Sequence, residues 1–493
     1  MQLFHENGND SIEGVDVKHA CYGGTFALFT AFDRIHSRYW DGRYCVVVSA
    51  DIAEYEEGPA RPSGGCGAVA LLLGKGACID LAVPRASYKA NEYDFYKPHL
   101  DSPYPVVDGP LSNRCYLNAL DSCFTSYRAK MEQLGTEWRP IATGNQDFGA
   151  DTSISPDFWV FHAPYNKLVA KTFGRVIYRD FLSNPAAYYK RFADDEDTMR
   201  FLRKYESVPC RETVASRQVI KGFERISSEW YKSYVAPSTA VPKAVGNCYT
   251  ASIFMGLISL IVDCGDDLDS KLMGKEIQLF SYGSGTVASL YSLKVMQSEA
   301  ARQSLAKMVE NNDIGKRLGD RRKIRCDEYT QIMNQKQQRL HSHCQRGTDG
   351  HFVPQSAVDV DHFYPDTFYL ERIDSMKRRF YAKFECEVED EKGDLEEMKG
   401  IEIEPVHPLP VTMKEEEIKE NIARFKGDDD VSYDEQRKFG IPNLGHFIGD
   451  AVLIGAQKML DKAQDHGLST KGAIQIDEVL RTTHRVSTKC SNS

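Results

Sequence analysis

Three strand-like apolar runs surround a helical pattern near the start of the chain. The runs occupy residues 11–20, 43–53 and 67–74. Between the first two, Leu28, Phe32 and Ile35 recur at helical spacing within residues 23–40. The pattern predicts a strand–helix–strand unit, with a further buried strand after the proline- and glycine-rich residues 56–65.

A second unit with similar elements lies further along the chain. Residues 246–265 predict a helix, residues 275–285 a strand and residues 286–310 another helix. Residues 20–29 and 247–256 both place Cys-Tyr and small residues before an apolar helix. This agreement indicates an internal duplication.

The composition changes at about residue 385. Residues 385–412 are acidic and then proline-bearing, which is typical of a solvated linker. In the tail at 413–493, residues 446–467 have the spacing of an amphipathic helix. Its apolar face would carry Phe447, Ile448, Val452 and Leu460. The tail either packs on the body or acts as a flexible interaction arm.

Composition narrows the class of protein. The 493 residues carry a formal net charge of −10, which argues against a general nucleic-acid binder. The longest uncharged apolar stretch, residues 248–262, is shorter than the roughly 20 residues of a bilayer span, so we expect no membrane span. Thirteen cysteines without a C-x-x-C pair favour a reducing compartment, and residues 1–10 resemble neither a secretory signal nor a transit peptide.

Cys21 is the first candidate for chemistry. It lies where a predicted strand gives way to a helix, so the amides and dipole of the helix start would favour its thiolate. Gly23 and Gly24 would leave room for a substrate. The alternative is a small buried side chain in the core, and the local sequence leaves both open.

Residues 157–182 hold the second candidate. A strand-like run ends at His162, and the following helix carries Lys167, Lys171 and Arg175 on one face. The three cations would suit the phosphates of a nucleotide-bearing substrate, and His162 would donate a proton or a hydrogen bond. The alternative is a solvated basic face with a structural histidine.

Two further patterns are weak. Gly283, Gly285 and Ala288 fit the G-x-G-x-x-A dinucleotide fingerprint, but the chain then continues helically, without the required second strand and acidic residue. His341, His343, Cys344 and His351 lack a regular zinc spacing, so we expect no metal site.

Seven ordered blocks resemble the eukaryotic hydroxymethylglutaryl-CoA synthase family. They carry, among others, the motifs A-C-Y-G-G, A-R-P-S-G-G, Y-D-F-Y-K-P, F-H-A-P, G-N-C-Y-T and F-S-Y-G-S-G. The blocks are residues 12–29, 40–55, 60–74, 93–121, 161–175, 245–260 and 280–295. The resemblance covers residues 1–384 and leaves the acidic linker and the tail unexplained.

The resemblance implies a fold. It is a thiolase-like layered αβαβα body of two similar α/β halves with the active site between them. The halves would be residues 1–165 and 166–384, followed by the linker at 385–412 and the helical tail at 413–493. The family chain carries further strands before its cysteine, so we expect the first half to be N-terminally incomplete.

The resemblance also implies roles for particular residues. Cys21 would accept the acetyl group of acetyl-CoA as a thioester, and His162 would bind and polarise acetoacetyl-CoA. Lys167 and Lys171 would contact the coenzyme A portion. The residues that match substrate-contacting or nearby acidic positions are Ser63, Ser112, Asn247, Ser284, Asp51 and Asp94. Cys248 falls where the family commonly has an apolar residue, which indicates a structural role.

Two departures from the family pattern bear on activity. Pro59 stands where the family usually has asparagine, so a side-chain amide contact would be lost. No residue aligns with the family's general-base glutamate, which lies in the segment before the cysteine. Glu6 and Glu13 are too near Cys21 in sequence to replace it. We therefore expect either an incomplete gene model or a shortened, catalytically compromised relative.

The implied activity is acyl transfer with carbon–carbon bond formation. Acetyl-CoA would condense with acetoacetyl-CoA and water to 3-hydroxy-3-methylglutaryl-CoA, in isoprenoid synthesis and without a cofactor beyond the coenzyme A thioesters. We expect a homodimer located in the cytoplasm, with a mitochondrial form left open. The alternatives are a ketoacyl-synthase-type condensing enzyme, which would use malonyl thioesters, and an inactive pseudoenzyme of the same fold.

Overall fold

The computed structural model describes most of the first 344 residues and two short later strands. The described ranges are 8–9, 11–99, 102–143, 156–321, 323–344, 368–373 and 378–383. The predicted linker and the tail, with its amphipathic segment at 446–467, lie outside these ranges.

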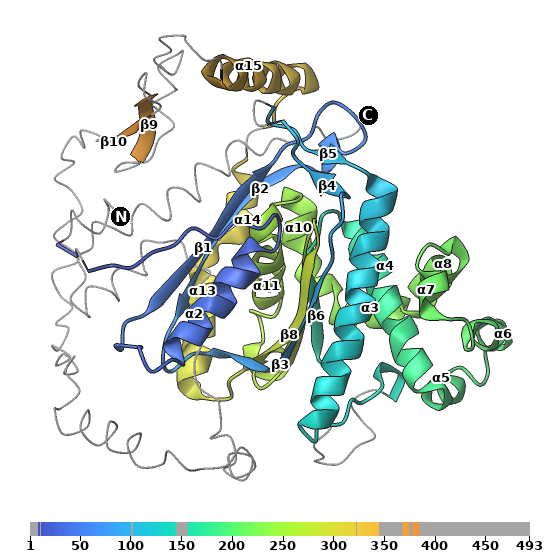
Figure 1. The fold of residues 1–493 in the computed structure, drawn as a ribbon. Helices are drawn as coiled ribbons and strands as arrows, with labels where there is room; N and C mark the ends of the chain where they lie inside the picture. Colours follow the sequence, from blue (N-terminus) through green and yellow to red (C-terminus); the bar gives the residue numbers. More distant parts are fainter. Residues whose placement is uncertain are drawn as a thin grey trace, which may run out of the picture.

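Two sheets form the body of the molecule (Figure 1). The first is the antiparallel hairpin of β1 (Cys45–Ala53) and β2 (Gly65–Leu73). The second has four strands in the order β3 (Ile79–Lys89), β8 (Val287–Val295), β7 (Glu276–Gly283) and β6 (Phe158–Phe161). Only the pairing of β6 with β7 is parallel in this sheet. Two short antiparallel pairs are β4 (Phe95–Tyr96) with β5 (Val106–Val107) and β9 (Phe368–Ile373) with β10 (Arg379–Lys383).

The helices fall into three groups along the described chain. The helices nearest the sheets are α2 (Gly23–Ile35), α3 (Gly109–Gln133), α4 (Asn166–Ser183) and α11 (Ser252–Asp263). A peripheral lobe holds α5 (Pro185–Arg191), α6 (Glu196–Tyr205), α7 (Cys210–Thr213), α8 (Arg217–Ile226) and α9 (Ser228–Tyr234). The others are α10 (Ala240–Val245), α12 (Leu268–Lys271), α13 (Glu299–Asn312), α14 (Ile314–Gly319) and α15 (Cys326–Cys344). Single 3-10 turns are η1 (Arg61–Ser63), η2 (Ile141–Thr143), η3 (Ala236–Thr239) and η4 (Tyr249–Ala251).

Helices α2 and α11 lie between the two sheets, and α3 and α4 cover the far face of the four-stranded sheet (Figure 1). Alternation along the strands divides the interior into two cores. In β7, Ile277 and Leu279 face α2 and α11, whereas Phe280 and Tyr282 face α3 and α4. The layers therefore alternate sheet and helix, and the predicted α/β class is confirmed.

Most of the predicted elements near the site are present. The expected helices at 23–40 and 246–265 are α2 and α11, and the expected strands at 43–53, 67–74 and 275–285 are β1, β2 and β7. Each of the two helices is followed by an antiparallel hairpin, β1–β2 after α2 and β7–β8 after α11. The repeated helix–hairpin unit agrees with the duplication inferred from the sequence.

Two predictions were wrong. Residues 11–20 form no strand; their only ladder contact in the described chain is an isolated bridge between His19 and Cys21. Residues 286–310 are not one helix, because β8 occupies the first part and α13 the second. A short apolar run is buried equally well as strand or helix, so its spacing alone does not decide between them.

The structure also shows that the G-x-G-x-x-A motif does not form a dinucleotide-binding turn. Gly283, Gly285 and Ala288 join two antiparallel strands. No helix begins after this turn, so the amides of a helix start are not available there for a pyrophosphate. The four-stranded sheet takes strands from both sides of residue 165, and the division into 1–165 and 166–384 stays a prediction.

Candidate functional site

Cys21 is held in a tight turn directly before α2. Ala20 has a φ of +40°, which is uncommon for a residue with a side chain, and the Tyr22 amide donates to the His19 carbonyl at 2.9 Å. The start of α2 abuts the start of α11, because the Gly24 amide donates to the Thr250 hydroxyl. A β-carbon at Gly24 would lie 2.8 Å from the Thr250 carbonyl oxygen, so only glycine allows this approach. The duplicated helix starts therefore meet at Cys21.

The environment of the Cys21 thiol differs from the sequence expectation. Burial raises its pKa, and the carboxylates of Asp51 and Asp94 raise it further. The contribution of the backbone lowers the pKa but is the smallest of the four causes. The prediction that the helix start favours the thiolate was therefore wrong for the free protein. A thiol in this site needs a base or a bound substrate before it reacts.

The two carboxylates near Cys21 come from different elements. Asp51, on β1, is half-buried, accepts from the Ile52 amide at 2.8 Å, and has a pKa raised by burial. Asp94 is fully buried before β4 and accepts from the Tyr282 hydroxyl at 2.8 Å and from the Gly285 amide at 3.3 Å. These bonds fix Asp94 against the turn that ends β7.

His162 follows β6 and is 1% exposed. Its amide donates to the Phe280 carbonyl at 2.9 Å, and its carbonyl accepts from the Tyr116 hydroxyl at 2.7 Å. Burial lowers the pKa of the imidazole to about 3, so the ring is neutral at physiological pH. Within the described chain, its Nδ1 has no hydrogen-bond partner.

Tyrosine rings connect His162 to the surroundings of Cys21. The Tyr116 ring stacks at 6.4 Å from the His162 ring and lies 4.9 Å from that of Tyr282. Tyr282 in turn holds Asp94, and the electrostatic influence of Cys21 reaches Tyr116. The structure thus brings Cys21, His162 and Asp94 around one pair of tyrosines.

Asn247 belongs to the same region. It is 2% exposed, and its amide donates to the Ser63 carbonyl at 2.9 Å. The Asn247 carboxamide donates through Nδ2 to the Tyr55 hydroxyl at 3.0 Å and accepts through Oδ1 from the Tyr249 amide at 2.9 Å. Ser63 is half-buried and donates its hydroxyl to the Ala60 carbonyl at 2.7 Å. Asn247 and Ser63 are therefore brought together, as the motifs suggested.

Ser284 occupies the turn between β7 and β8. A β-carbon at the preceding Gly283 would lie 2.7 Å from that of Tyr22 and 3.1 Å from the His19 carbonyl. The glycine lets this turn approach the residues that flank Cys21. Ser284 therefore lies in a turn that approaches the residues on either side of Cys21.

Ser112 lies at the start of α3, and Lys167 and Lys171 lie in the first two turns of α4. Ser112 is half-buried in the first turn of α3, where its amide donates to the Asp108 carbonyl at 2.8 Å. The two helix starts are joined by the Tyr165 hydroxyl, which donates to Asn113 at 2.7 Å. Lys171 lies 6.0 Å over the Tyr165 ring, and Lys167 is exposed. Lys167 therefore faces solvent, whereas Lys171 is half-buried beside Tyr165.

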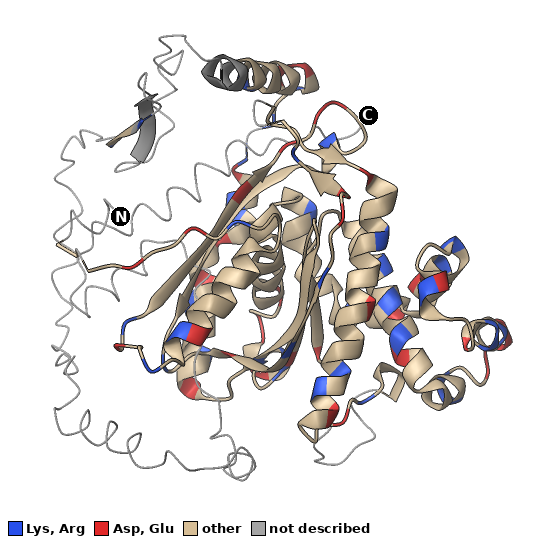
Figure 2. Ribbon diagram, in the orientation of Figure 1, with Lys and Arg blue, Asp and Glu red and all other residues tan. Residues whose placement is uncertain are grey.

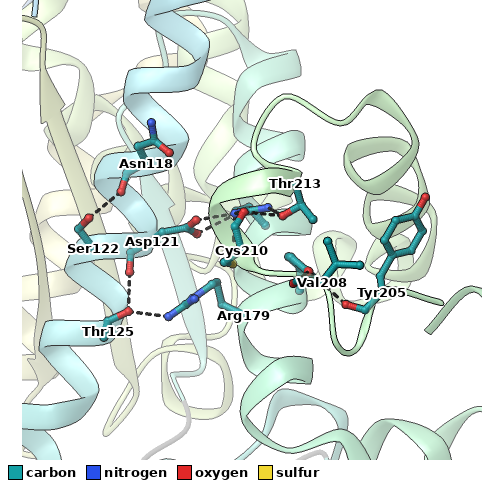
Figure 3. A network of polar contacts seen from close by, with 11 residues as sticks. Asn118, Asp121, Ser122, Thr125, Arg179, Tyr205, Val208, Cys210 and Thr213 are labelled. Atoms are coloured by element: carbon teal, nitrogen blue, oxygen red, sulfur yellow. Dashed lines mark hydrogen bonds and ion pairs between the residues drawn. The ribbon is translucent and has the colours of Figure 1, made fainter. Parts of the chain in front are cut away.

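The sequence predicted that Arg175 would share a cationic face with Lys167 and Lys171. In the structure it does not. It is 3% exposed and forms an ion pair with Asp121 of α3. It also donates to the Thr213 hydroxyl at 2.7 Å and to the Cys210 carbonyl at 2.8 Å. Figure 3 shows this network between α3, α4 and α7. Burial removes Arg175 from any ligand, and its role is to fasten the peripheral lobe to the body.

Charge elsewhere is concentrated on outer elements. Figure 2 shows lysine and arginine along α4 and the peripheral lobe, whereas α11 and the four-stranded sheet are largely uncharged. Within the described ranges, no three histidine, cysteine or acidic side chains form a metal-binding group, and no helix is long and apolar enough to cross a membrane.

The side chains of His341, His343, Cys344 and His351 lie outside the description. Pro59 is exposed in the turn before η1.

Sequence reasoning missed the tyrosines. Four tyrosines hold or contact the predicted site residues: Tyr55, Tyr116, Tyr249 and Tyr282. All four lie in the ordered blocks: Tyr55 ends the block at 40–55 and Tyr116 lies in the block at 93–121, while Tyr249 belongs to G-N-C-Y-T and Tyr282 to F-S-Y-G-S-G. Their positions inside those blocks were the available signal.

The arrangement is suited to acyl transfer. A buried thiol at a helix start can attack a thioester carbonyl. A neutral imidazole and a fixed carboxamide can donate hydrogen bonds to carbonyl oxygens, and carboxylates nearby can accept protons. Lys167, which is exposed, and the half-buried Lys171 near the start of α4 suit an anionic part of a ligand.

Family models match most of the chain. Residues 1–78 match the model described as "Hydroxymethylglutaryl-coenzyme A synthase N terminal" and residues 79–384 match the one described as "Hydroxymethylglutaryl-coenzyme A synthase C terminal". The mitochondrial hydroxymethylglutaryl-CoA synthase of Sus scrofa is 39% identical over 389 residues, covering 78% of this chain and 71% of the relative. The cytoplasmic enzyme of Rattus norvegicus is also 39% identical, over 387 residues, with 78% and 69% covered.

Solved structures share the fold. MvaS in complex with 3-hydroxy-3-methylglutaryl coenzyme A aligns with a TM-score of 0.53 and 27% identity, covering 74% of this chain and 73% of MvaS. PksG, a synthase from Bacillus subtilis, aligns with a TM-score of 0.50 and 21% identity over 74% of each chain. These neighbours confirm the predicted thiolase-like α/β fold.

Proposed function

The chain belongs to the hydroxymethylglutaryl-CoA synthase family, and from this premise we propose that it condenses acetyl-CoA with acetoacetyl-CoA and water. The products are 3-hydroxy-3-methylglutaryl-CoA and free coenzyme A. One observation carries the proposal: Cys21 is buried where the two duplicated helices meet, beside Asp94 and within the electrostatic reach of Tyr116, whose hydroxyl donates to the His162 carbonyl. The reaction belongs to the mevalonate route to isoprenoids, as the family does.

Acetyl transfer to Cys21 is the first step. The sulfur attacks the acetyl thioester carbon, and the new S–C bond forms as the bond to the coenzyme A sulfur breaks. The thiol proton leaves with coenzyme A. Because burial and two carboxylates raise the pKa of Cys21, proton removal must accompany the attack rather than precede it.

Condensation follows on the acetylated enzyme. The acetyl methyl group loses a proton and its carbon attacks the ketone carbon of acetoacetyl-CoA, whose oxygen is protonated. Water then cleaves the Cys21 thioester, which yields the carboxylate and restores the thiol. His162 is neutral, with a pKa of about 3, so it serves as a hydrogen-bond donor to the ketone oxygen. We assign no residue to the removal of the methyl proton.

The two ends of the substrate would contact different parts of the site. Asn247, Ser63 and Ser284 surround the region of Cys21 and would position the acyl groups. Lys167 and Lys171 would bind phosphates of coenzyme A at the surface. Ser112, in the α3 turn whose Asn113 accepts from Tyr165 of the α4 start, would contact the substrate as well.

The remaining expectations are part of this proposal. We propose that coenzyme A thioesters are the only small molecules required and that the chain acts as a homodimer in the cytoplasm. The relatives include both mitochondrial and cytoplasmic forms. The thirteen cysteines without a C-x-x-C pair favour a reducing compartment.

The test separates the two chemical steps. The full chain is incubated with acetyl-CoA and digested, and the acetyl group is located by mass spectrometry; loss of acetoacetyl-CoA is then followed by absorbance. We expect acetyl-Cys21 in the wild type and in Cys248→Ala, its counterpart in the repeat, but none in Cys21→Ala. Folded wild type without acetyl-Cys21 would contradict the proposal. Acetylation without condensation would limit the chain to the first step.

A further inference from the structure

Three serines form a row across the four-stranded sheet beside the start of α2. Ser289 of β8 lies directly opposite Ser87 of β3 on one side and Ser281 of β7 on the other. Residues directly opposite each other in antiparallel strands point to the same face of a sheet, so the three hydroxyls share one face. Ser281 and Ser289 are fully buried, whereas Ser87 is exposed. This serine row therefore runs from the surface into the interior.

The start of α2 is bonded to the serine row at two points. The Tyr22 hydroxyl lies 2.7 Å from Oγ of Ser289, which in turn lies 2.7 Å from Oγ of Ser87. Three residues further along the chain, the Thr25 hydroxyl donates to Oγ of Ser281 at 2.7 Å. Residues three apart lie on the same side of a helix, so both bonds fasten one side of the first turn of α2 to the sheet.

These bonds replace a helix cap at α2. Tyr22 is the N-cap residue and makes no side-chain cap bond, whereas Asp108 of α3 and Ser298 of α13 each accept from an amide in the first turn of their helix. A helix start without a side-chain cap frays more readily. The Tyr22 backbone is also close to β7, since a β-carbon at Gly283 would lie 2.8 Å from the Tyr22 nitrogen. The sheet thus fixes Tyr22 at its hydroxyl and at its backbone.

Cys21 is joined covalently to Tyr22, so its thiol lies where the serine row holds the helix start. We infer that Ser289 and Ser281 are positioning residues for Cys21. By fixing Tyr22 and Thr25, they place the thiol in line with the thioester carbon that it attacks, and a displacement of about 1 Å can cost on the order of 100-fold in rate. The inference rests on the proposed function, because it requires acyl transfer to Cys21.

The test compares two serines of β8. Ser289→Ala removes the bond to Tyr22. Ser292→Ala is the matched control, because Ser292 is equally buried on the same strand but its hydroxyl lies 3.1 Å from that of Tyr127 in α3. The rate of acetyl-Cys21 formation is measured by rapid quench and mass spectrometry, together with KM for acetyl-CoA. Alkylation of Cys21 by iodoacetamide gives a second readout that needs no acetyl transfer.

We expect Ser289→Ala to slow acetylation about tenfold, with KM changed less than about twofold, because the thiol is misplaced rather than the substrate released. Alkylation should become about threefold faster, because a loosened helix start exposes the buried thiol. Ser292→Ala should match the wild type in both rates, although it loses a comparable hydrogen bond. Equal effects of the two variants, or unchanged rates in Ser289→Ala, would overturn the inference while leaving the proposed function intact.

Two further variants distinguish positioning from a general loss of stability. Thr25→Val keeps the shape of the side chain and removes only the bond to Ser281, so it should also slow acetylation at constant KM. Because Ser289 acts through Tyr22, Ser289→Ala should have no further effect in a Tyr22→Phe background. An unchanged rate in Thr25→Val would contradict the role of Ser281, and an equal loss in both backgrounds would contradict that of Ser289. A wild type that never acetylates Cys21 would overturn the proposed function as well.

Discussion

The two helix–hairpin units are built alike but buried differently. Every residue of β7 is buried, and β8 is buried except at Val287, which is half-buried, and at Lys294, which is exposed. In β1 the inner-facing Val47 is 5% exposed, whereas Val46, Val48 and Ile52 on the other face are 46%, 54% and 39% exposed. The same kind of apolar run therefore occupies a covered strand in one unit and a half-covered strand in the other.

The cause is the position of each hairpin in the layers. The β7–β8 hairpin lies within the four-stranded sheet and has helices on both faces, as a strand with continuous apolar residues requires. In the described chain, β1 has α2 on one face and only β2 as a neighbour. An apolar run in the sequence thus indicates that a strand can be buried. How many of its residues are buried depends on the layers that cover the strand in the folded chain.

The largest difference is expected from removing a side chain in each hairpin. Phe280→Ala in β7 removes a fully buried ring that lies 5.2 Å from Tyr116, and it should lower the free energy of unfolding by about 3–5 kcal/mol. Val48→Ala in β1 should change it by less than about 0.5 kcal/mol. Urea denaturation measures both. A comparable loss for Val48→Ala would mean that this face of β1 is covered in solution.

A smaller difference is expected at the helix starts, where Gly24 of α2 corresponds to Ala251 before α11. A methyl group at Gly24 would meet the Ser49 hydroxyl, the Thr250 carbonyl at 2.8 Å and the Phe254 ring at 3.0 Å. Gly24→Ala should therefore cost about 1–3 kcal/mol through overpacking. Ala251→Gly should cost about 1 kcal/mol, because it adds chain entropy and removes a methyl group. Thermal unfolding of both variants tests this order; a neutral Gly24→Ala would refute the close approach.

The buried His162, which follows β6 beside the β7–β8 hairpin, should give a pH dependence. The pKa of His162 is about 3 in the folded state and near 6.5 in the unfolded state, so below pH 6.5 the unfolded chain binds one more proton. Stability is then lost as pH falls from 6.5 toward 3, by at most about 1.4 kcal/mol per pH unit, with no contribution above pH 6.5.

His162→Gln should flatten this dependence. Urea unfolding at several pH values between 4 and 7 is compared with that of the wild type and of the control His36→Gln, at the end of α2. Parallel curves for wild type and His162→Gln would show that the imidazole titrates normally in the folded protein.

The smallest effect concerns the thiol of the first unit. Asp51→Asn removes one of the two negative charges that raise the pKa of Cys21, so the pKa should fall and the thiolate fraction rise. Alkylation of Cys21 by iodoacetamide at pH 8 should become about three- to tenfold faster. Asp41→Asn, at an exposed position before β1, serves as the control. An unchanged rate would assign the raised pKa to burial and Asp94, without a contribution from Asp51.

Much of the fold was predictable because spacing and turn residues were clear. The helix at Leu28, Phe32 and Ile35 and the valine-rich strand β1 follow from local pattern. The strand β8 did not, because it pairs between β3 and β7 and buries residues in a separate core on each face, which no local pattern reveals. Pairing with distant strands therefore decided that this apolar run forms a strand, a choice that its local spacing left open.

The site was predictable in its residues more than in its electrostatics. Motifs identified Cys21, His162 and Asn247, and the structure brings their neighbourhoods together. The raised pKa of Cys21 and the burial of Arg175 depend on carboxylates more than 25 residues away in sequence, Asp51 and Asp94 in one case and Asp121 in the other. Such shifts follow from contacts that only the folded chain creates.

The meeting of the two helix starts has a consequence for how the chain is made. Gly24 and Thr250 are separated by 226 residues, and the bond between Tyr22 and Ser289 spans 267. At about 5–20 residues per second, translation takes on the order of 10–50 s to supply the partners of the first helix. During that interval the thiol of Cys21 is exposed on the nascent chain, because the segments that bury it have not yet been made. The surroundings that make this thiol unreactive in the free protein are thus among the last to form.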